Sequence, residues 1–319
     1  MTSRATGSIA ERIRANVAQV LVGKESATEL LLVALATGGH VLLEDMPGTG
    51  KTMLAKSLAR SIGSAFRRVQ FTPDLLPTDL TGLSVYSQAT GSFDFRPGPL
   101  FTQILLADEI NRATPRTQSA LLECMEERQV TIEGQTRILP RPFLVLATQN
   151  PVEQEGTFPL PEAQLDRFLL KLPVGYPAVE EEVAMVARFT AGNPLTELSA
   201  VVSAEEIIEL QDAVAAVQLH PVLQRYAVDL VTATRRAEGV LVGASPRATL
   251  ALCRAAQALA LLSERDHVLP DDLQRLMEPV LSHRLILAPT SRLRGLTPAA
   301  VLGRVRESIP VPAEPIGVA

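Results

Sequence analysis

The most constraining feature of this sequence is a glycine-rich segment between an apolar run and a helical pattern. Residues 40–44 (HVLLE), with the apolar run VLL at their centre, are the first expected strand. The segment DMPGTGKT covers residues 45–52, and a helix is expected from Lys51 to about Ile62. Gly48 and Gly50 allow the backbone to curl with its N–H groups turned inward, and the helix N-terminus adds further donors. A strand, an anion-binding loop and a helix in this order predict a parallel α/β sheet with a phosphate site at its edge.

The segment is a near match to the phosphate-binding (Walker A) pattern G-x-x-x-x-G-K-[ST]. Asp45 stands where the pattern has its first glycine. Lys51 supplies a full positive charge for the β- and γ-phosphates, and the Thr52 hydroxyl is a ligand for Mg²⁺. The alternative is a chance glycine-rich turn, which the flanking strand and helix patterns disfavour. The residues assigned to nucleotide binding here are Pro47, Gly48, Thr49, Gly50, Lys51, Thr52 and Met53.

A second apolar run ends in two carboxylates. Residues 104–107 read ILLA, and Asp108 and Glu109 follow, 57 residues after Lys51. A parallel sheet would bring the carboxyl end of this strand beside the glycine-rich loop. Asp108 would then hold Mg²⁺ through water (Walker B), and Glu109 would polarise the water that attacks the γ-phosphate. An ordinary solvated turn is the alternative for two adjacent acids, and the neighbouring loop argues against it.

The remaining patterns divide the chain into an α/β part and a helical part. Further strands are expected at 66–71, 142–147 and 168–172, and hairpins at 84–95 and 129–139, each with a glycine in its turn. Helix signals take over after about residue 190, beginning with the capping box at 203–206 and including Ser245-Pro246. We expect an α/β nucleotide-binding domain at 1–192, an all-α lid domain at 193–309 and a Pro-rich tail at 310–319.

Composition excludes several classes of protein. The net charges of residues 1–100, 101–200 and 201–319 are +2, −6 and −1, so no third of the chain is a basic nucleic-acid surface. There is no Trp, with nine Phe and three Tyr, which leaves few platforms for base stacking. The two cysteines and four histidines lack metal-ligand spacing. No apolar leader or membrane-length run is present, so a cytoplasmic protein without membrane insertion is expected.

Taken together, these motifs resemble the MoxR family of AAA+ ATPases, and the resemblance covers nearly the whole chain. The stretches that carry it are LLEDMPGTGKT (42–52), LADEINRA (106–113), LLECMEE (121–127), LATQNP (146–151), PLPEAQLDRF (159–168) and GASPRA (243–248). The family fold is a parallel P-loop sheet with flanking helices and inserted β-hairpins, followed by a helical lid. The departure at Asp45 affects the entry turn of the loop.

The resemblance implies roles for further residues. Asn150 would be the sensor-1 residue that orients the attacking water, the alternative being a plain Asn-Pro turn. Arg167 is similar to the arginine finger that completes a neighbouring subunit's site, the alternative being an ion pair with Asp166 or Glu162. Arg247 resembles the sensor-2 arginine, which reaches from the lid to the phosphates.

Two weaker assignments follow from the same resemblance. Gly23 and Lys24 match the region that lines the adenine pocket in related ATPases. Arg112 directly follows the acids of the second motif, so contact with a neighbouring subunit or with the next site's nucleotide is a hypothesis.

The function implied by the resemblance is ATP hydrolysis in a homo-oligomeric ring, expected to be a hexamer, with ATP and Mg²⁺ as cofactors. Family members look like chaperones for assembly of protein complexes or insertion of metal cofactors, often with partners that contain a von Willebrand factor A domain. The two hairpins would contact such a client. A nucleic-acid motor is one alternative, which the lack of Lys and Arg at 84–95 disfavours. A nucleotide-gated scaffold is the other, which Glu109 disfavours, since a scaffold needs no water-activating carboxylate.

Overall fold

A five-stranded parallel sheet forms the centre of the molecule. The computed structural model describes residues 3–44, 48–89, 91–149 and 156–312. The strands lie in the order β2-β5-β8-β1-β9, and every pair in the sheet is parallel. Their bounds are β1 Val41–Glu44, β2 Phe66–Gln70, β5 Ile104–Asp108, β8 Leu144–Gln149 and β9 Leu170–Leu172. The non-sequential order brings the ends of β1, β5 and β8, which carry the predicted motifs, side by side.

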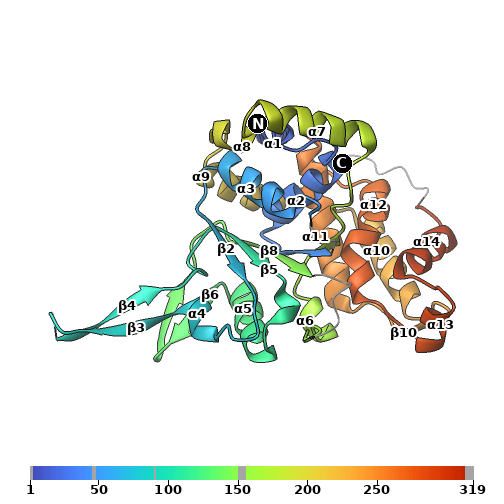
Figure 1. Ribbon diagram of the computed structural model, residues 1–319. Coiled ribbons are helices and arrows are strands. Elements are labelled where there is room, and N and C mark those ends of the chain that lie inside the picture. Colours follow the sequence, from blue (N-terminus) through green and yellow to red (C-terminus); the bar gives the residue numbers. More distant parts are fainter. Residues whose placement is uncertain (1–2, 45–47, 90, 150–155, 313–319) are drawn as a thin grey trace.

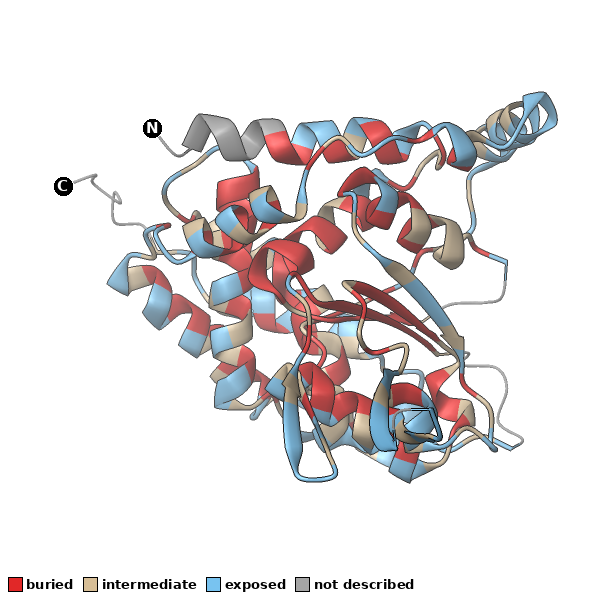
Figure 2. Cartoon of the chain, turned by 90° about the vertical axis from the view of Figure 1, so that its left-hand side faces the viewer, coloured by how far each residue is buried: buried red, intermediate tan, exposed pale blue. Residues whose placement is uncertain are grey.

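Helices cover both faces of this sheet (Figure 1). One face, which includes Leu43 and Leu106, packs with α1 (Ser3–Ala18), α2 (Glu25–Thr37) and α3 (Lys51–Ser61). The other face, which includes Leu42 and Leu105, packs with α5 (Pro115–Glu127). Successive residues of a strand point to opposite faces, so a strand buried on both sides is apolar throughout. This explains the continuous apolar runs, and Figure 2 shows the central strands buried between exposed helical surfaces.

Both predicted hairpins are present. The first consists of β3 (Gly82–Ser87) and β4 (Ser92–Pro97), and the second of β6 (Gln129–Ile132) and β7 (Gln135–Ile138). Glu133 and Gly134 turn the second hairpin with φ values of 51° and 78°, as a two-residue turn with both central residues left-handed requires. The first hairpin extends away from the body of the molecule (Figure 1).

The C-terminal part is a helical domain with one small departure from the prediction. Its helices are α9 Ala204–Val214, α10 Pro221–Thr234, α11 Pro246–Leu262, α12 Pro270–Leu281, α13 Pro289–Leu293 and α14 Pro298–Ser308. Ser203 Oγ accepts from the N–H of Glu206, and the Glu206 carboxylate accepts from the N–H of Ser203, so the capping box forms. The expected absence of strands is wrong, because β10 (Val240–Val242) pairs antiparallel with β11 (Ile286–Leu287). Such short strands are too brief for a periodic signal.

The remaining elements among the described residues are five short ones and the longer helix α7. They are α4 Pro77–Thr81, the 3₁₀ turn η1 Ile110–Arg112, α6 Glu162–Leu165, α7 Val179–Ala191, α8 Pro194–Glu197 and the 3₁₀ turn η2 Ser282–Arg284. The helical domain packs against α1, α2 and the sheet. One apolar cluster includes residues from the helical domain, from these two helices and from the sheet. Within the described ranges, no helix is both long enough and apolar enough to cross a membrane.

Candidate nucleotide-binding site

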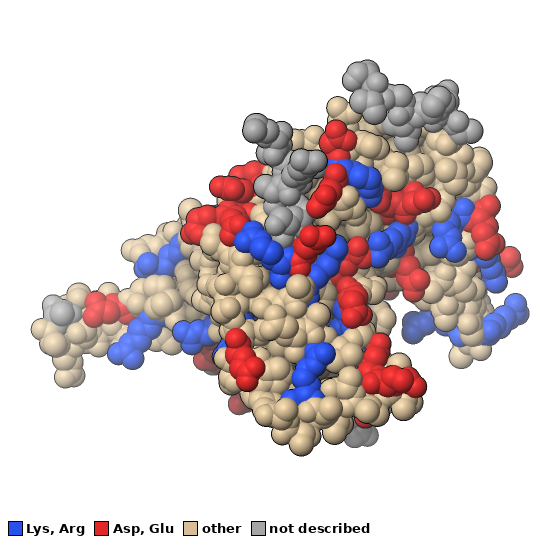
Figure 3. Space-filling model, turned by 90° about the horizontal axis from the view of Figure 1, so that it is seen from above, with Lys and Arg blue, Asp and Glu red and all other residues tan. Residues whose placement is uncertain are grey.

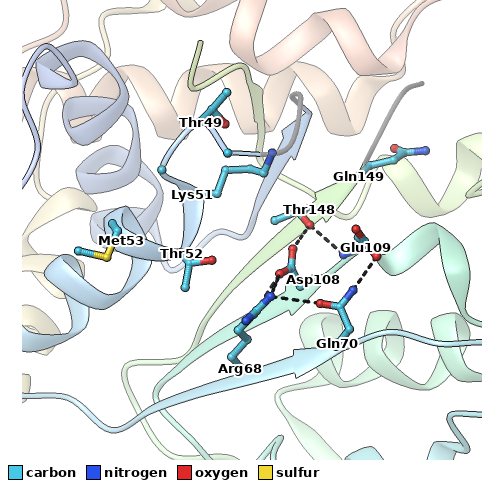
Figure 4. A pocket seen from close by; sticks show the side chains of 12 residues that line it. Thr49, Lys51, Thr52, Met53, Arg68, Gln70, Asp108, Glu109, Thr148 and Gln149 are labelled. Atoms are coloured by element: carbon cyan, nitrogen blue, oxygen red, sulfur yellow. Dashed lines mark hydrogen bonds and ion pairs between the residues drawn. The ribbon is translucent and has the colours of Figure 1, made fainter. Parts of the chain in front are cut away.

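A cavity of about 370 Å³ opens at the carboxyl edge of the sheet. It lies between the loop before α3 and the ends of β5 and β8, and Figure 4 shows the side chains around it. The residues that line it are Gly48, Thr49, Gly50, Lys51, Thr52, Met53, Arg68, Gln70, Asp108, Glu109, Thr148 and Gln149. The two motifs predicted to act together therefore meet in one cavity.

The loop before α3 has the backbone of an anion-binding turn. Gly48 and Gly50 adopt φ values of 86° and 91°, which L side chains rarely adopt, so glycine is required at both positions. Gly50 is the N-cap of α3 and has no side chain with which to cap the helix. The first N–H groups of α3 and the ammonium group of Lys51 thus supply positive potential at the cavity.

The Thr148 hydroxyl fixes the two acids at the end of β5. Glu109 is left-handed, with φ 56° and ψ 51°, which turns the chain sharply directly after Asp108. Its backbone N–H donates to Thr148 Oγ1 (2.8 Å), and the same hydroxyl donates to Asp108 Oδ1 (2.6 Å). Thr148 is only 2% exposed, so water does not compete for these bonds. One buried hydroxyl on the neighbouring strand therefore holds the Asp108 carboxylate and the Glu109 backbone.

Three further polar side chains hold the carboxylates in place. Arg68 donates to Asp108 Oδ2 from Nε (3.0 Å) and from a terminal nitrogen (2.6 Å). Gln70 Nε2 donates to Glu109 Oε2 (2.6 Å), and Arg112 Nε lies 2.9 Å from the same oxygen. Glu109 thus sits at the cavity with a defined carboxylate position. The hypothesis that Arg112 contacts a neighbouring subunit stays open, and within this chain Arg112 pairs with Glu109.

The oxygen donors of this cavity fit a magnesium ion. Thr52 supplies a hydroxyl and Asp108 a carboxylate to the same cavity. Mg²⁺ prefers oxygen ligands, binds through one or two protein groups, and keeps several waters. Thr52 and Asp108 would hold the ion, and Arg68 donates to the same Asp108 carboxylate.

The two predicted catalytic arginines lie together, but not at this cavity. Arg167 follows α6, and Arg247 is the second residue of α11. Arg167 Nε is 3.1 Å from Glu126 Oε2, and a terminal nitrogen of Arg247 is 3.0 Å from Glu126 Oε1. The described residues that line the cavity include neither arginine. Arg247 therefore lies outside the lining of this cavity in its own chain, and its sensor-2 role stays a prediction. The acid that pairs with Arg167 is neither Asp166 nor Glu162.

Gly23 and Lys24 line a different cavity, of about 450 Å³, between the start of α2, the chain after β9 and the lid. Lys24 is buried, and its Nζ donates to the carbonyls of Val174 (3.0 Å) and Gly175 (2.9 Å). Lys24 therefore ties α2 to the segment that follows β9. Its assignment to the adenine pocket stays a prediction.

Some predicted site residues fall outside the described ranges. These are Asn150, Pro47 and the substituted position Asp45.

The sequence prediction missed four residues that line the cavity, Arg68, Gln70, Thr148 and Gln149. Thr148 and Gln149 are the last two residues of β8, and Arg68 and Gln70 lie on β2 beside β5. A signal for Thr148 existed, because polar residues at the carboxyl end of a parallel strand face the same edge as the other motifs. Gln70, the last residue of β2, gave the same signal, whereas Arg68 gave none, because no sequence pattern shows that β2 neighbours β5.

A parallel sheet with a phosphate-type loop, strand-end acids and a helical lid defines a AAA-type nucleotide-binding protein. A family model described as "ATPase family associated with various cellular activities (AAA)" matches residues 40–170, and a model described as "AAA lid domain" matches 232–304. The chain is 49% identical over 299 residues to "Uncharacterized protein YeaC" of Bacillus subtilis, covering 94% of this chain and 93% of the relative.

Two further matches cover almost all of the chain. "Chaperone MoxR1" of Mycobacterium tuberculosis is 44% identical over 311 residues, covering 95% of this chain and 82% of the relative. A solved crystal structure from Cytophaga hutchinsonii has a TM-score of 0.91 and 40% identity, covering 98% of this chain and 97% of that one. The chain belongs to the MoxR family of AAA+ ATPases, as the resemblance predicted.

Proposed function

We propose that this chain binds and hydrolyses ATP with Mg²⁺ at the cavity beside Lys51, and that it does so in a ring of identical subunits. The observation that carries the proposal is that Thr148 holds Asp108 and Glu109 at the cavity that the glycine loop also lines. Lys51 and the N–H groups of α3 would bind the phosphates. Glu109 would accept a proton from the attacking water, and a bound Mg²⁺ would neutralise charge on the phosphate oxygens.

The position of the two arginines supports a ring. Arg167 and Arg247 pair with Glu126 and do not line the cavity of their own chain. A positive charge beside the γ-phosphate contributes much of the rate in other nucleotide hydrolases. A head-to-tail ring would place the arginines of one subunit at the cavity of the next. Under this proposal Arg247 acts on the neighbouring subunit's nucleotide, together with Arg167.

We infer a chaperone-like action on a protein client, with maturation of a protein complex and insertion of a metal cofactor as the kinds of work that it would serve. The hairpin of β3 and β4 exposes Tyr86 and Phe93, whose rings pack edge to face at 5.4 Å. An exposed aromatic pair on an extended hairpin suits apolar segments of a polypeptide. A partner with a von Willebrand factor A domain remains a proposal from the resemblance.

The charges of the hairpins do not favour a nucleic-acid motor. Arg137 of the second hairpin lies 4.0 Å from the centre of the Phe95 ring, and Glu133 accepts a hydrogen bond from Ser84. These contacts join the two hairpins, so Arg137 is engaged within the protein. In the view of Figure 3, basic and acidic side chains are intermixed and form no continuous basic surface. A surface that follows the phosphates of a nucleic-acid strand would need a continuous basic stretch.

The test is light scattering and phosphate release from the same samples, with and without ATP and Mg²⁺. The wild type is compared with Glu109→Gln, which should bind ATP without hydrolysing it, and with Lys51→Ala, which should not bind. We expect particle size to grow to about six protomers when nucleotide is added, and we expect only the wild type to release phosphate. A monomer without ATPase activity would refute the proposal and favour a scaffold role.

A further inference from the structure

Glu126 joins two arginines that come from different parts of the fold. It lies in the last turn of α5, Arg167 lies in the turn between α6 and β9, and Arg247 begins α11 of the lid. Each oxygen of the Glu126 carboxylate takes one arginine, Oε2 with Arg167 Nε and Oε1 with a terminal nitrogen of Arg247. A guanidinium has five N–H donors, and each ion pair occupies only part of that set. The carboxylate therefore bridges the two cations.

The helix end that carries Glu126 is firmly anchored. His40, at the start of β1, approaches the carbonyl of Met125 through Nε2 (2.9 Å) and accepts from the N–H of Val145 through Nδ1 (3.0 Å). Arg128, left-handed at the C-cap of α5, donates to the carbonyl of Gly38 (2.7 Å). Both contacts tie the last turn of α5 to the central sheet and its flanking turn, so Glu126 has a fixed place.

The turn that carries Arg167 is anchored to the lid on both sides of that residue. Arg284 Nε pairs with Asp166 Oδ1 (2.6 Å), and one of its terminal nitrogens donates to the carbonyl of Phe168 (2.7 Å). His283 Nε2 lies 3.0 Å from the same carbonyl. The Arg284 side chain is 4% exposed, so this contact is buried. The lid and the turn that carries Arg167 are thus held together, and Arg247 belongs to the same lid.

We infer that Glu126 is a positioning residue that holds Arg167 and Arg247 together as one pair for the neighbouring subunit's nucleotide. The inference rests on the proposed function. Two guanidinium groups brought to one place repel each other, and a shared carboxylate offsets that repulsion. With the neutral Gln in place of Glu126, Arg167 and Arg247 lose the carboxylate that pairs with both of them. The pair would then spread over several side-chain conformations, and few of these would suit a γ-phosphate.

The first experiment compares Glu126→Gln with a matched control. Glu127→Gln makes the same change one residue further along α5, where the carboxylate is exposed and has no recorded ion pair or hydrogen bond among the described residues. We expect Glu126→Gln to lower kcat at least about tenfold with an unchanged KM for ATP, because it leaves the cavity of its own chain intact. Glu127→Gln should stay within about twofold. Glu126→Asp keeps the charge and should retain more activity than Gln.

The second experiment separates positioning from folding or binding defects. Glu126→Gln has an intact cavity and a disturbed arginine pair, whereas Glu109→Gln binds ATP at a cavity that cannot hydrolyse it and has an intact pair. In a randomly mixed ring of equal parts, about a quarter of the interfaces join an intact cavity to an intact pair. We therefore expect phosphate release by the mixture to exceed that of either variant alone. The melting temperature of Glu126→Gln should match the wild type, since exposed ion pairs add little stability.

The outcomes distinguish this inference from the proposed function. If the wild type does not assemble or hydrolyse ATP, or if Arg167→Ala keeps full activity, the proposed function fails. If the wild type and Arg167→Ala behave as proposed but Glu126→Gln keeps full kcat, the positioning role of Glu126 is wrong. A Glu126→Gln variant that gains activity, or a mixture without recovery, overturns it as well.

Discussion

Thr148 offers the sharpest test of how the two acids at the end of β5 are held. The variant Thr148→Val keeps the branched shape of the side chain and removes only its hydroxyl. Two hydrogen bonds are lost, one from the Glu109 N–H (2.8 Å) and one to the Asp108 carboxylate (2.6 Å). A neutral hydrogen bond contributes about 1 kcal/mol and one to a charged group about 2 kcal/mol, which gives about 3 kcal/mol in total.

The effect on catalysis should accompany this loss of stability. Without the Thr148 hydroxyl, the left-handed turn at Glu109 loses the bond that fixes its N–H, and the carboxylate that we propose as the general base shifts relative to the cavity. A displacement of about 1 Å costs up to about a hundredfold in rate, so we expect kcat to fall between about tenfold and a hundredfold. The KM for ATP should change little, because Lys51 and the loop remain.

The assays are urea unfolding and steady-state phosphate release, on Thr148→Val beside Thr148→Ser. The serine variant keeps the hydroxyl and loses one methyl group, so it should lose about 1 kcal/mol and retain most of the activity. A Thr148→Val variant with the kcat and unfolding free energy of the wild type would refute this account of the site. Equal losses of kcat and of unfolding free energy in both variants would show that the effect comes from packing and not from the hydroxyl.

The remaining predictions concern stability. Burial lowers the pKa of His40 from 6.5 to about 4, so between these pH values the unfolded chain binds a proton that the folded chain does not. The free energy of unfolding, at its full value above pH 6.5, should therefore fall by about 3 kcal/mol as the pH drops to 4. Urea unfolding at pH 7.5 and 4.5 should show this fall, and His40→Gln should reduce it. Asp166→Asn leaves the buried Arg284 without its carboxylate and should cost about 3 kcal/mol by the same assay, whereas Asp212→Asn, at an exposed pair, should cost little. Gly134→Ala places a side chain at φ 78° in open space, so thermal melting should report a loss of about 1 kcal/mol with ATPase activity kept, and a much larger loss would contradict a purely local backbone cost.

Local sequence signals were most reliable where the chain determines its own conformation. Ser203 and Glu206 specify a helix start through bonds between neighbours, and the structure contains both bonds. Glu133-Gly134 likewise specifies a tight turn, and both residues are left-handed. The short pair of β10 and β11 escaped prediction, because its pairing partners are far apart in sequence and each strand is too short to carry a period.

Long-range placement was accessible only where a general rule of the fold applied. Parallel strands bring their carboxyl ends to one edge, so the meeting of Lys51 with Asp108 and Glu109 could be predicted from order along the chain alone. No such rule says which acid an arginine will meet. Glu126 pairs with Arg167 across 41 positions and with Arg247 across 121, and neither pairing was predicted.

The sequence by itself determined the chemistry of this protein. Glycines at positions 48 and 50, Lys51, Thr52 and two acids after an apolar strand define a nucleotide site, because phosphate binding needs those groups at those spacings. Tertiary structure alone decided how the groups are held and where the arginines lie. The order of strands placed Arg68, Gln70 and Thr148 beside the acids, and lid packing brought Arg247 to Glu126. Such contacts depend on the packing of whole elements, which no local pattern encodes.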